Sequence, residues 1–294
     1  MRLLGGVLVL AVAVAAGGWV LSAPDPLPAE TLADLEGDAE RGARIFHAAG
    51  CAGCHTAPDA EAAEAPVLVG GQRFASPFGT FVAPNISQDP EAGIGDWTDA
   101  EIANAVMRGI SPEGAHYYPA FPYTTYIRAE PQDVVDLIAH LRTLPADATP
   151  SQPHEVGFPF NIRRGIGLWK LMYLSDDWIV PGLEGQAAEG QYLVEALGHC
   201  GECHTPRGPF GQLDTGRWLG GAPHPAGDGT IPNITPGGLS WSENDIAAYL
   251  DSGFTPEFDS AGGEMAEVIR NVSQLPDEDL AAIAAYVKAV PAVE

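Results

Sequence analysis

Two stretches of the chain carry cysteine and histidine in the spacing Cys-x-x-Cys-His: Cys51-Ala-Gly-Cys54-His55 and Cys200-Gly-Glu-Cys203-His204. Two cysteines three residues apart lie on one turn of a helix, where their thiols can form thioethers with the two vinyl groups of a haem. The adjacent histidine is then held beneath the iron as an axial ligand. The sequence therefore predicts two covalently attached haems c, held by Cys51, Cys54, Cys200 and Cys203 and ligated axially by His55 and His204.

Other chemistry is open to such cysteines. A Cys-x-x-Cys pair alone can bind zinc or act as a redox-active dithiol. The histidine that follows each pair, the repetition of the motif and a candidate export segment at the N-terminus favour haem attachment. All four cysteines of the chain lie in the two motifs, so none is left for a disulfide.

A methionine in the second half of the chain is the candidate for the sixth iron ligand of the second haem. Met265 follows Gly262 and Gly263 in a stretch between two expected helices, where its thioether could reach the distal face of a haem. The alternative is a core methionine that fills a gap. The glycines and flanking charges favour a loop, so we expect Met265 to ligate iron.

The equivalent position in the first half carries a residue that cannot bind iron. The interval from Trp241 to Met265, counted from Trp97, ends at Phe121. The nearest capable side chain is His116, which we expect as the sixth ligand of the first haem. Met107 is the other option, although it falls inside an expected helix, and an open or weakly ligated iron is the third. His116 could also be only a surface loop histidine.

The two motifs belong to an internal repeat. The same landmarks follow each motif in the same order: Gly70-Gly71, Pro84-Asn85-Ile86 and Trp97, then Gly220-Gly221, Pro232-Asn233-Ile234 and Trp241. From the first motif cysteine to the landmark proline there are 33 residues in one half and 32 in the other. Chance composition rarely gives such a match, so the chain is predicted to contain one module twice.

Each module is expected to contain three short helices. They are a helix before the motif (39–49 and 190–197), a helix opened by a capping box (from Thr98-Asp-Ala-Glu101 and Ser242-Glu-Asn-Asp245) and a closing helix (from Pro131 and Asp277). The capping boxes place Ser or Thr three residues before an acid, and Pro131 suits the first turn of a helix. Short helices joined by long loops indicate an all-α fold.

The expected division of the chain is a signal peptide or signal anchor (1–24), a first haem module (36–147), a linker (148–184) and a second haem module (185–294). The linker is Pro-rich but carries aromatic clusters at 158–163 and 169–173. Such a segment is too apolar for a free linker, so we expect it to pack across the two modules. A docking surface for a partner is the alternative.

An uncharged apolar stretch at residues 3–23 follows Arg2. It is long enough to form most of a membrane-crossing helix and longer than the usual core of a signal peptide. This favours a retained N-terminal apolar helix over a cleaved one. Acidic residues follow the stretch, so the positive-inside rule keeps the N-terminus in the cytoplasm. The body is then expected on the periplasmic side of the inner membrane, anchored there or soluble after cleavage.

The charge of the chain restricts its partners. Acidic residues outnumber basic ones by 39 to 14, which gives a formal net charge of −25. Nucleic-acid binding requires a basic surface and is therefore excluded. A charged docking partner would be basic, although the acidity could equally serve only solubility.

Three segments resemble the cytochrome c subunits of membrane-bound alcohol and gluconate dehydrogenases: Phe74 to Ile86 (FASPFGTFVAPNI), Tyr117 to Thr124 (YYPAFPYT) and Gly198 to Pro206 (GHCGECHTP). The resemblance implies two tandem class I cytochrome c domains. It also implies electron relay from a dehydrogenase donor to a cytochrome, oxidase or quinone acceptor. This chain lacks the third haem module of the family's longer members and has Phe121 where their loop has methionine, which puts quinone reduction in doubt.

Electron transfer is therefore the expected function, without independent catalysis. A soft thioether favours ferrous iron, so the haem of His204 and Met265 is expected at the higher potential, and electrons are expected to leave through it. One rival is a haem enzyme that uses an open first haem on a small substrate such as peroxide. Another is a membrane tether or assembly subunit.

Overall fold

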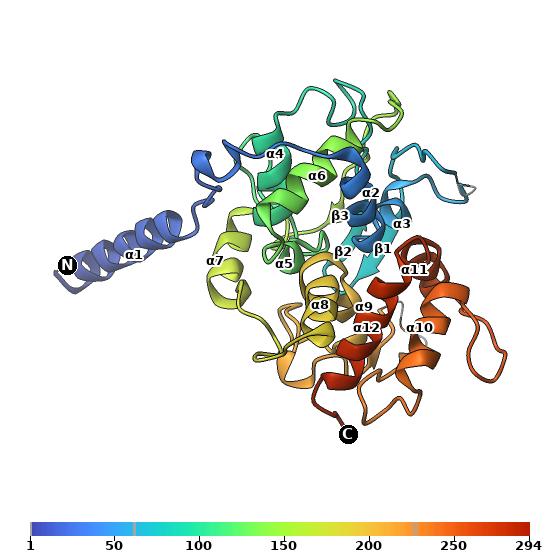
Figure 1. Cartoon of the computed structure of the whole chain (residues 1–294). Helices are drawn as coiled ribbons and strands as arrows, with labels where there is room; N and C mark the ends of the chain where they lie inside the picture. The colour runs from blue at the N-terminus through green and yellow to red at the C-terminus, as the bar shows by residue number, and fades with distance from the viewer. Residues whose placement is uncertain (1, 61–62, 226, 228) are drawn as a thin grey trace.

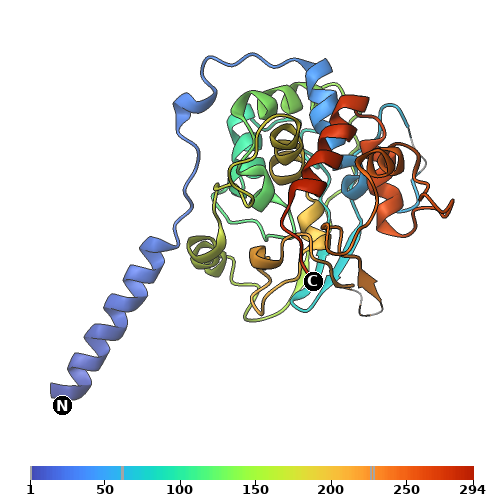
Figure 2. The ribbon, with the colours of Figure 1, turned by 60° about the horizontal axis from the view of Figure 1, so that its bottom comes forward.

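A computed structural model describes residues 2–60, 63–225, 227 and 229–294, with the backbone alone at 2–5, 7–9 and 11. Two helical modules lie side by side, and an N-terminal helix projects away from them (Figures 1 and 2). Met1 and residues 61–62, which belong to the expected segments 1–24 and 36–147, lie outside the described residues. The body therefore has the two-module organisation that the repeat predicts.

The helices of the first module are α2 (Ala39–Ala48), α3 (Cys51–His55), α4 (Asp99–Ala103) with its π-helical continuation η2 (Asn104–Arg108), α5 (Tyr123–Tyr126) and α6 (Pro131–Leu141). Those of the second are α8 (Gln186–Tyr192) with the π-helical η3 (Leu193–Leu197), α9 (Cys200–His204), α10 (Glu243–Ser252), α11 (Glu264–Val272) and α12 (Asp277–Ala289). Short 3₁₀ turns are η1 (Ala29–Leu32) and η4 (Thr215–Arg217).

The helix starts expected at the two capping boxes and at Pro131 and Asp277 are confirmed, whereas the helix expected over 190–197 begins earlier, at Gln186. Thr98 and Ser242 each accept a hydrogen bond from the backbone three residues on and complete a capping box with Glu101 and Asp245. Pro131 occupies the first turn of α6. These caps satisfy backbone N–H groups that a helix start would otherwise leave without partners.

Each module is held together by the crossing of its first and closing helices. Helix α2 packs on α6, and α8 packs on α12. At both crossings a glycine lies against the facing backbone. A Cβ added to Gly42 would lie 1.9 Å from the carbonyl oxygen of Asp136, and one added to Gly190 would lie 1.8 Å from that of Ala282. Glycine is required there because no side chain fits between the helices.

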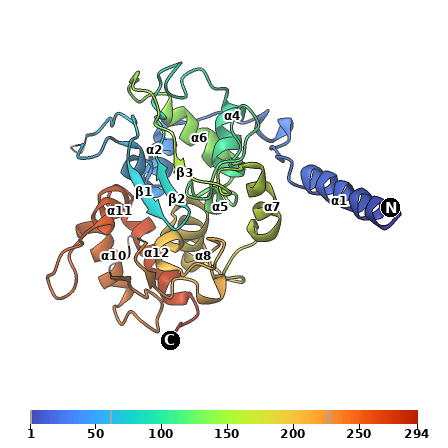
Figure 3. The same ribbon diagram turned by 180° about the vertical axis from the view of Figure 1, so that it is seen from behind.

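The expectation of a purely all-α fold is corrected by two small sheets. Strands β1 (Arg73–Ser76) and β2 (Gly79–Val82) form a hairpin, and β3 (Glu155–Val156) from the linker adds to β2, pairing Thr80 with Glu155 (Figure 3). The second module has the antiparallel pair β4 (Ala222–Pro223) and β5 (Thr230–Ile231). The β-favouring run Thr80-Phe-Val82 after a Pro-Phe turn is the local signal for this hairpin. The fold is thus mostly helical.

The N-terminal apolar stretch forms helix α1 (Arg2–Leu21). In the part of the chain that the structure describes, no helix combines the length and the hydropathy that a membrane span needs.

The linker contacts both modules. It supplies β3 and helix α7 (Arg164–Tyr173). From α7, Lys170 Nζ donates to the carbonyl of Gly109 in module one at 2.9 Å. Trp169 Nε1 donates to the carbonyl of Phe210 in module two, also at 2.9 Å. Helix α7 therefore lies across the boundary between the modules.

The modules also contact each other through equivalent positions. Two residues after the crossing glycine of module one, Arg44 forms a bidentate ion pair with Asp279 of α12, with N–O distances of 2.6 and 2.8 Å. Two residues after Gly190 of module two, the Tyr192 hydroxyl donates to Asp133 of α6 at 2.5 Å. Asp133 and Asp279 are each the third residue of their helix. The interface is therefore reciprocal.

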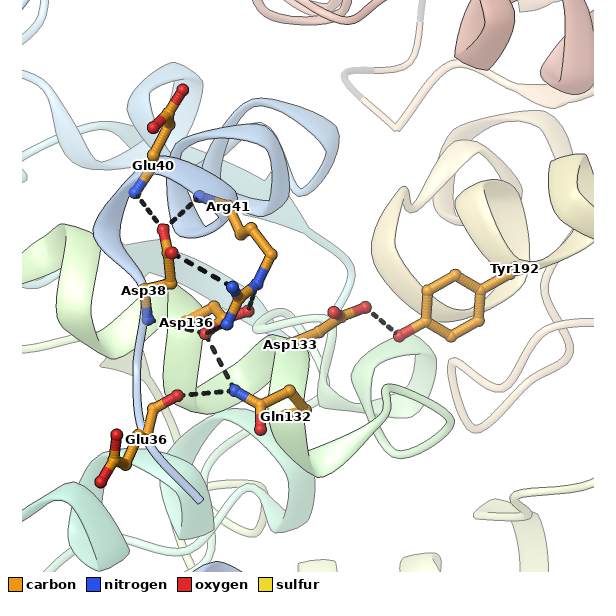
Figure 4. A network of polar contacts seen from close by, with 8 residues as sticks. All are labelled: Glu36, Asp38, Glu40, Arg41, Gln132, Asp133, Asp136 and Tyr192. Atoms are coloured by element: carbon orange, nitrogen blue, oxygen red, sulfur yellow. Dashed lines mark hydrogen bonds and ion pairs between the residues drawn. The ribbon is translucent and has the colours of Figure 1, made fainter.

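A buried carboxylate joins the start of module one to its closing helix (Figure 4). The side chain of Asp136 is 1% exposed and accepts from Arg41 Nε at 2.7 Å, Arg41 Nη2 at 2.9 Å, the Asp38 amide at 2.8 Å and Gln132 Nε2 at 2.9 Å. Burial alone would raise the pKa of Asp136, but the hydrogen bonds, first that of Arg41, lower it overall. The carboxylate is therefore kept ionised by its donors.

We expect Asp136→Asn to lower the free energy of unfolding at neutral pH by about 3 kcal/mol, because the variant leaves a buried network without its charge. The lowered pKa of Asp136 sets the pH dependence. Its contribution is full above the unfolded pKa of about 3.9 and is lost as pH falls through the lower folded pKa. Denaturant titration of both proteins should show their difference shrinking below about pH 4. The exposed Asp251→Asn should leave stability nearly unchanged, and an equal loss there would contradict the assignment.

Candidate functional site

The first Cys-x-x-Cys-His motif forms the one-turn helix α3, which begins after Gly50 with a positive φ of 61°. His55 at its end has its Nδ1 2.9 Å from the carbonyl oxygen of Pro84. The backbone is fixed nearby, because the Gly70 amide donates to the His55 carbonyl at 2.6 Å. The landmark Pro-Asn-Ile therefore orients the motif histidine.

The second motif repeats this geometry. His204 has its Nδ1 2.8 Å from the carbonyl oxygen of Pro232, and the Gly221 amide donates to the His204 carbonyl at 2.7 Å. Gly221, the second glycine of its pair, thus takes the place of Gly70, the first of its own. The repeat is accurate in structure but shifted by one residue at this landmark.

The two histidines fit an iron site. A carbonyl oxygen only accepts, so Nδ1 of each ring must donate, which leaves the lone pair on Nε2 free to bind a metal. Burial lowers the pKa of both His55 and His204, while the proline carbonyls partly oppose this. Both imidazoles are therefore neutral near pH 7, as an axial ligand must be.

The cysteines fit thioether attachment better than a thiolate metal site. Burial raises the pKa of Cys51 to about 12 and that of Cys200 to about 11, so these thiols stay protonated at neutral pH. No group of three or more His, Cys, Asp or Glu gathers to hold a metal ion among the described residues. A raised thiol pKa is the opposite of the lowered pKa that a redox-active dithiol needs.

The two motifs face each other across the module boundary. Burial, and then the neighbouring thiol of Cys203, raises the pKa of Cys54 to about 11. His199, which precedes the second motif, hydrogen-bonds to the carbonyl of Ala49, which precedes the first. The Tyr126 hydroxyl donates to the same carbonyl at 3.1 Å. The two haem-binding segments are thus direct neighbours.

Helix α5, which follows Phe121, and helix α11, which contains Met265, each pack on the opposite module. Helix α11 contacts α2 and α3, and α5 contacts η3. Thr124 Oγ1 donates to Glu202 Oε1, inside the second motif, at 2.9 Å. A Cβ added to Gly53, inside the first motif, would lie 3.6 Å from Asn271 Nδ2 of α11. The first motif is therefore in contact with α11 of module two, and the second motif with α5 of module one.

The equivalence of Phe121 and Met265 is supported by the backbone. An isolated bridge pairs Ile110 with His116 in module one, and another pairs Phe254 with Ser260 in module two. Both bridges lie at the same intervals from Trp97 and Trp241. His116 therefore corresponds to Ser260, and Phe121, five residues on, corresponds to Met265.

Met265 lies in the first turn of α11 rather than in a loop, and it packs partly buried against the core. Helix α11 was not expected because Gly262 and Gly263 resemble a loop. They precede the helix, and Gly263 is its N-cap. Ligation of iron by Met265 stays a prediction.

The candidates for the sixth ligand of the first haem have other contacts. The His116 ring is 3% exposed, and its Nε2 donates to the carbonyl of Ser22 at 2.9 Å. A Cβ on Gly167 of α7 would lie 2.7 Å from the same nitrogen. Met107 is 5% exposed and belongs to the hydrophobic core. His116 as an iron ligand stays a prediction, and this geometry favours a packing role.

We therefore expect His116→Ala to leave the low-temperature electron paramagnetic resonance spectrum of the oxidised protein unchanged. The variant should instead weaken the attachment of residue 22, measured as faster amide hydrogen exchange at residues 19–23. Loss of a low-spin signal with two histidine ligands would instead establish His116 as the ligand. His224→Ala, at a partly buried histidine of module two whose ring pairs with Glu264, serves as the control for a histidine away from this contact.

A buried carboxylate behind the second motif was missed at the sequence level. Glu195 is 1% exposed and accepts from the Tyr286 hydroxyl at 2.5 Å and the Ile179 amide at 2.6 Å. Trp218 Nε1 donates to the same hydroxyl at 2.7 Å. The Trp218 ring lies so close to Gly201 of α9 that a Cβ there would be 2.0 Å away. The linker, α12 and the motif are thus joined by one network. The sequence signal for this buried carboxylate is a glutamate within the otherwise apolar run 193–197.

Comparison with known proteins agrees with this site. Residues 39–145 and 187–291 match the family model of cytochrome c. The chain is 57% identical over 99% of both sequences to a protein of Cereibacter sphaeroides named diheme cytochrome c-type. It is 38% identical to the fructose dehydrogenase cytochrome subunit of Gluconobacter japonicus and 35% to the alcohol dehydrogenase (quinone) cytochrome c subunit of Gluconobacter oxydans. It covers 52% and 55% of the length of these two, with 86% of its own length aligned.

Proposed function

Because the chain belongs to the cytochrome c family and carries two covalently bound haems c, we propose that it relays electrons from a dehydrogenase to a downstream cytochrome, oxidase or other acceptor. Electron transfer itself follows from the family and from dehydrogenase cytochrome subunits among the relatives. The haems supply one-electron chemistry when bound. The donor, the acceptor and the direction of transfer are the proposed parts.

The observation that carries the proposal is the contact between the two haem-binding segments. His199 and Tyr126 both hydrogen-bond to the carbonyl of Ala49, directly between the motifs. Thr124 of module one holds Glu202 of the second motif. These contacts keep the two attachment helices close and in a fixed orientation, as a relay within one chain requires.

The residues also suggest a direction. Met265 offers a thioether to the second haem, while its counterpart Phe121 offers no ligand atom. A thioether raises the reduction potential relative to nitrogen ligation. We infer that electrons enter at the first module and leave through the second.

The proposed location is the periplasmic side of the inner membrane. The proposal rests on Arg2, the first residue of α1, and on Asp25 and Glu30, which follow the helix, because positive charge is retained on the cytoplasmic side. Covalent haem attachment takes place on exported chains, and the four motif cysteines form no disulfide and can receive the haems.

The relay is tested by adding substoichiometric one-electron reductant to the oxidised full chain and following both haems by stopped-flow absorbance. We expect the electron to redistribute to the Met265 haem at a rate that does not depend on protein concentration. A rate proportional to concentration would show transfer between molecules and overturn the internal relay. A redox titration that places the Met265 haem at the lower potential would reverse the direction.

A second function is favoured by one observation: Phe121 stands where module two has Met265. If the first iron keeps an open position, it binds small ligands such as peroxide. Cyanide titration of the oxidised chain distinguishes the functions. Binding of one equivalent of cyanide at micromolar concentration would support this second function. Absence of binding, because both irons keep two protein ligands, would leave electron relay as the only function of the two.

A further inference from the structure

Helix α7 has its apolar side chains on the outside. Leu168, Leu171 and Met172 are 42%, 61% and 63% exposed and share one face of the helix. On the opposite face Gly167 is buried, and the ammonium of Lys170 points inward to the Gly109 carbonyl at 2.9 Å. A surface helix normally exposes its polar face and buries its apolar face. Helix α7 does the reverse, so its solvent-exposed face is apolar.

The loop before α7 extends this apolar surface. Phe158, Phe160 and Ile162 are 82%, 47% and 53% exposed. Residues 157–173 contain three basic side chains and no acidic one, in a chain with 39 acidic and 14 basic residues. Lys170 points inward, and burial lowers its pKa to about 7, so the positive charge of the segment comes from Arg163 and Arg164. The segment is therefore a weakly cationic, apolar region on a strongly anionic protein.

Helix α7 is also joined to the end of α1. Arg164 Nε donates to Ser22 Oγ at 2.9 Å, and its guanidinium lies 4.4 Å from the centre of the Trp19 ring. Gly167 lies against the carbonyl of Ser22, since a Cβ there would be 2.2 Å from the oxygen. Figures 1 and 2 show α1 leaving the body beside α7. The apolar surface therefore begins where the N-terminal helix ends.

We propose that α7 and residues 158–162 lie in the interfacial layer of a bilayer that contains anionic lipids. Exposed aliphatic and aromatic side chains beside arginines are the composition of such interfacial helices. Anionic headgroups attract this cationic region and repel the rest of the chain. The inference rests on the proposed membrane location and adds the surface that makes the contact.

Another exposed apolar segment provides a control. Phe254 and Phe258, in the loop between α10 and α11, are 57% and 89% exposed. This loop is acidic, with Glu257 and Asp259 beside Phe258. It therefore matches the proposed surface in exposure and differs from it in charge.

The test uses single cysteines in the full chain, whose own four cysteines are haem thioethers. Leu171→Cys reports on α7, Phe258→Cys on the control loop and Leu10→Cys on α1. Each protein is placed in nanodiscs with about one third anionic lipid, and its rate of reaction with a membrane-impermeant maleimide is measured. We expect Leu10→Cys and Leu171→Cys to react at least tenfold more slowly than Phe258→Cys.

Other outcomes overturn the inference. A slow Leu10→Cys with a fast Leu171→Cys would leave the membrane location intact and remove α7 from the bilayer. Fast reaction at both would remove the membrane location as well. A Leu171→Cys that becomes slow only when a dehydrogenase is added would assign the surface to a protein partner instead.

Discussion

Gly190→Ala is expected to lower the free energy of unfolding by about 3 kcal/mol. The new methyl group would lie 1.8 Å from the carbonyl oxygen of Ala282 and 2.8 Å from Tyr286 Cβ, so α8 and α12 must move apart. Alanine's better helix propensity, about 1 kcal/mol, offsets only part of this cost. Denaturant titration of the holoprotein measures the change.

Two matched variants make this result specific. Gly42→Ala, at the equivalent crossing of module one, should destabilise by a similar amount because its methyl group would meet the Asp136 carbonyl at 1.9 Å. Gly165→Ala in α7 adds the same atom where nothing lies within 4 Å, and it should be neutral or slightly stabilising. Equal effects at all three positions would show that the crossings tolerate a side chain.

Met265→Ala is expected to lower the midpoint potential of one haem by roughly a tenth or more of the ~0.8 V range that axial ligands cover. The reason is loss of the thioether that favours ferrous iron. A spectroelectrochemical titration should show two well-separated potentials in the wild type. In the variant the upper one should fall, and the near-infrared charge-transfer band of methionine ligation should disappear.

Methionines elsewhere serve as controls for this result. Met172 is 63% exposed on α7, so Met172→Ala should leave both potentials unchanged. Met107→Ala should cost stability, since Met107 is buried in the core, without shifting either potential. A fall of potential in Met107→Ala would make Met107 a ligand of the first haem.

Local chemistry explains which elements the sequence predicted. Capping boxes at Thr98 and Ser242 are complete within four residues, so their helices were predictable. The repeated Pro-Asn-Ile was also visible in the sequence. The structure explains the repetition, because the proline carbonyl lies within hydrogen-bond distance of the motif histidine in both modules. Short-range rules and an internal repeat are thus sufficient for the capped helices and for the landmarks that contact the motif histidines.

Non-local contacts explain what was missed. Strand β3 forms because Glu155 pairs with Thr80 from a hairpin far away in the sequence. His199 had no matched position in the repeat, yet its ring crosses the module boundary to Ala49. The hydrogen bond between His116 and the Ser22 carbonyl likewise joins residues that are 94 positions apart in the sequence. No spacing rule on a single sequence reports such pairs.

The reciprocal interface has a consequence for redox tuning. The two contacts are equivalent: Arg44 corresponds to Tyr192, and their partner Asp279 corresponds to Asp133. The isologous contact of a two-fold dimer uses the same positions twice in this way. A homodimer has to repeat every ligand, so its two haems are identical. Covalent fusion of the two halves removes that constraint, and Phe121 opposite Met265 shows that they have diverged. The chain therefore keeps the paired geometry of a dimer while its two haem sites can differ in their ligands.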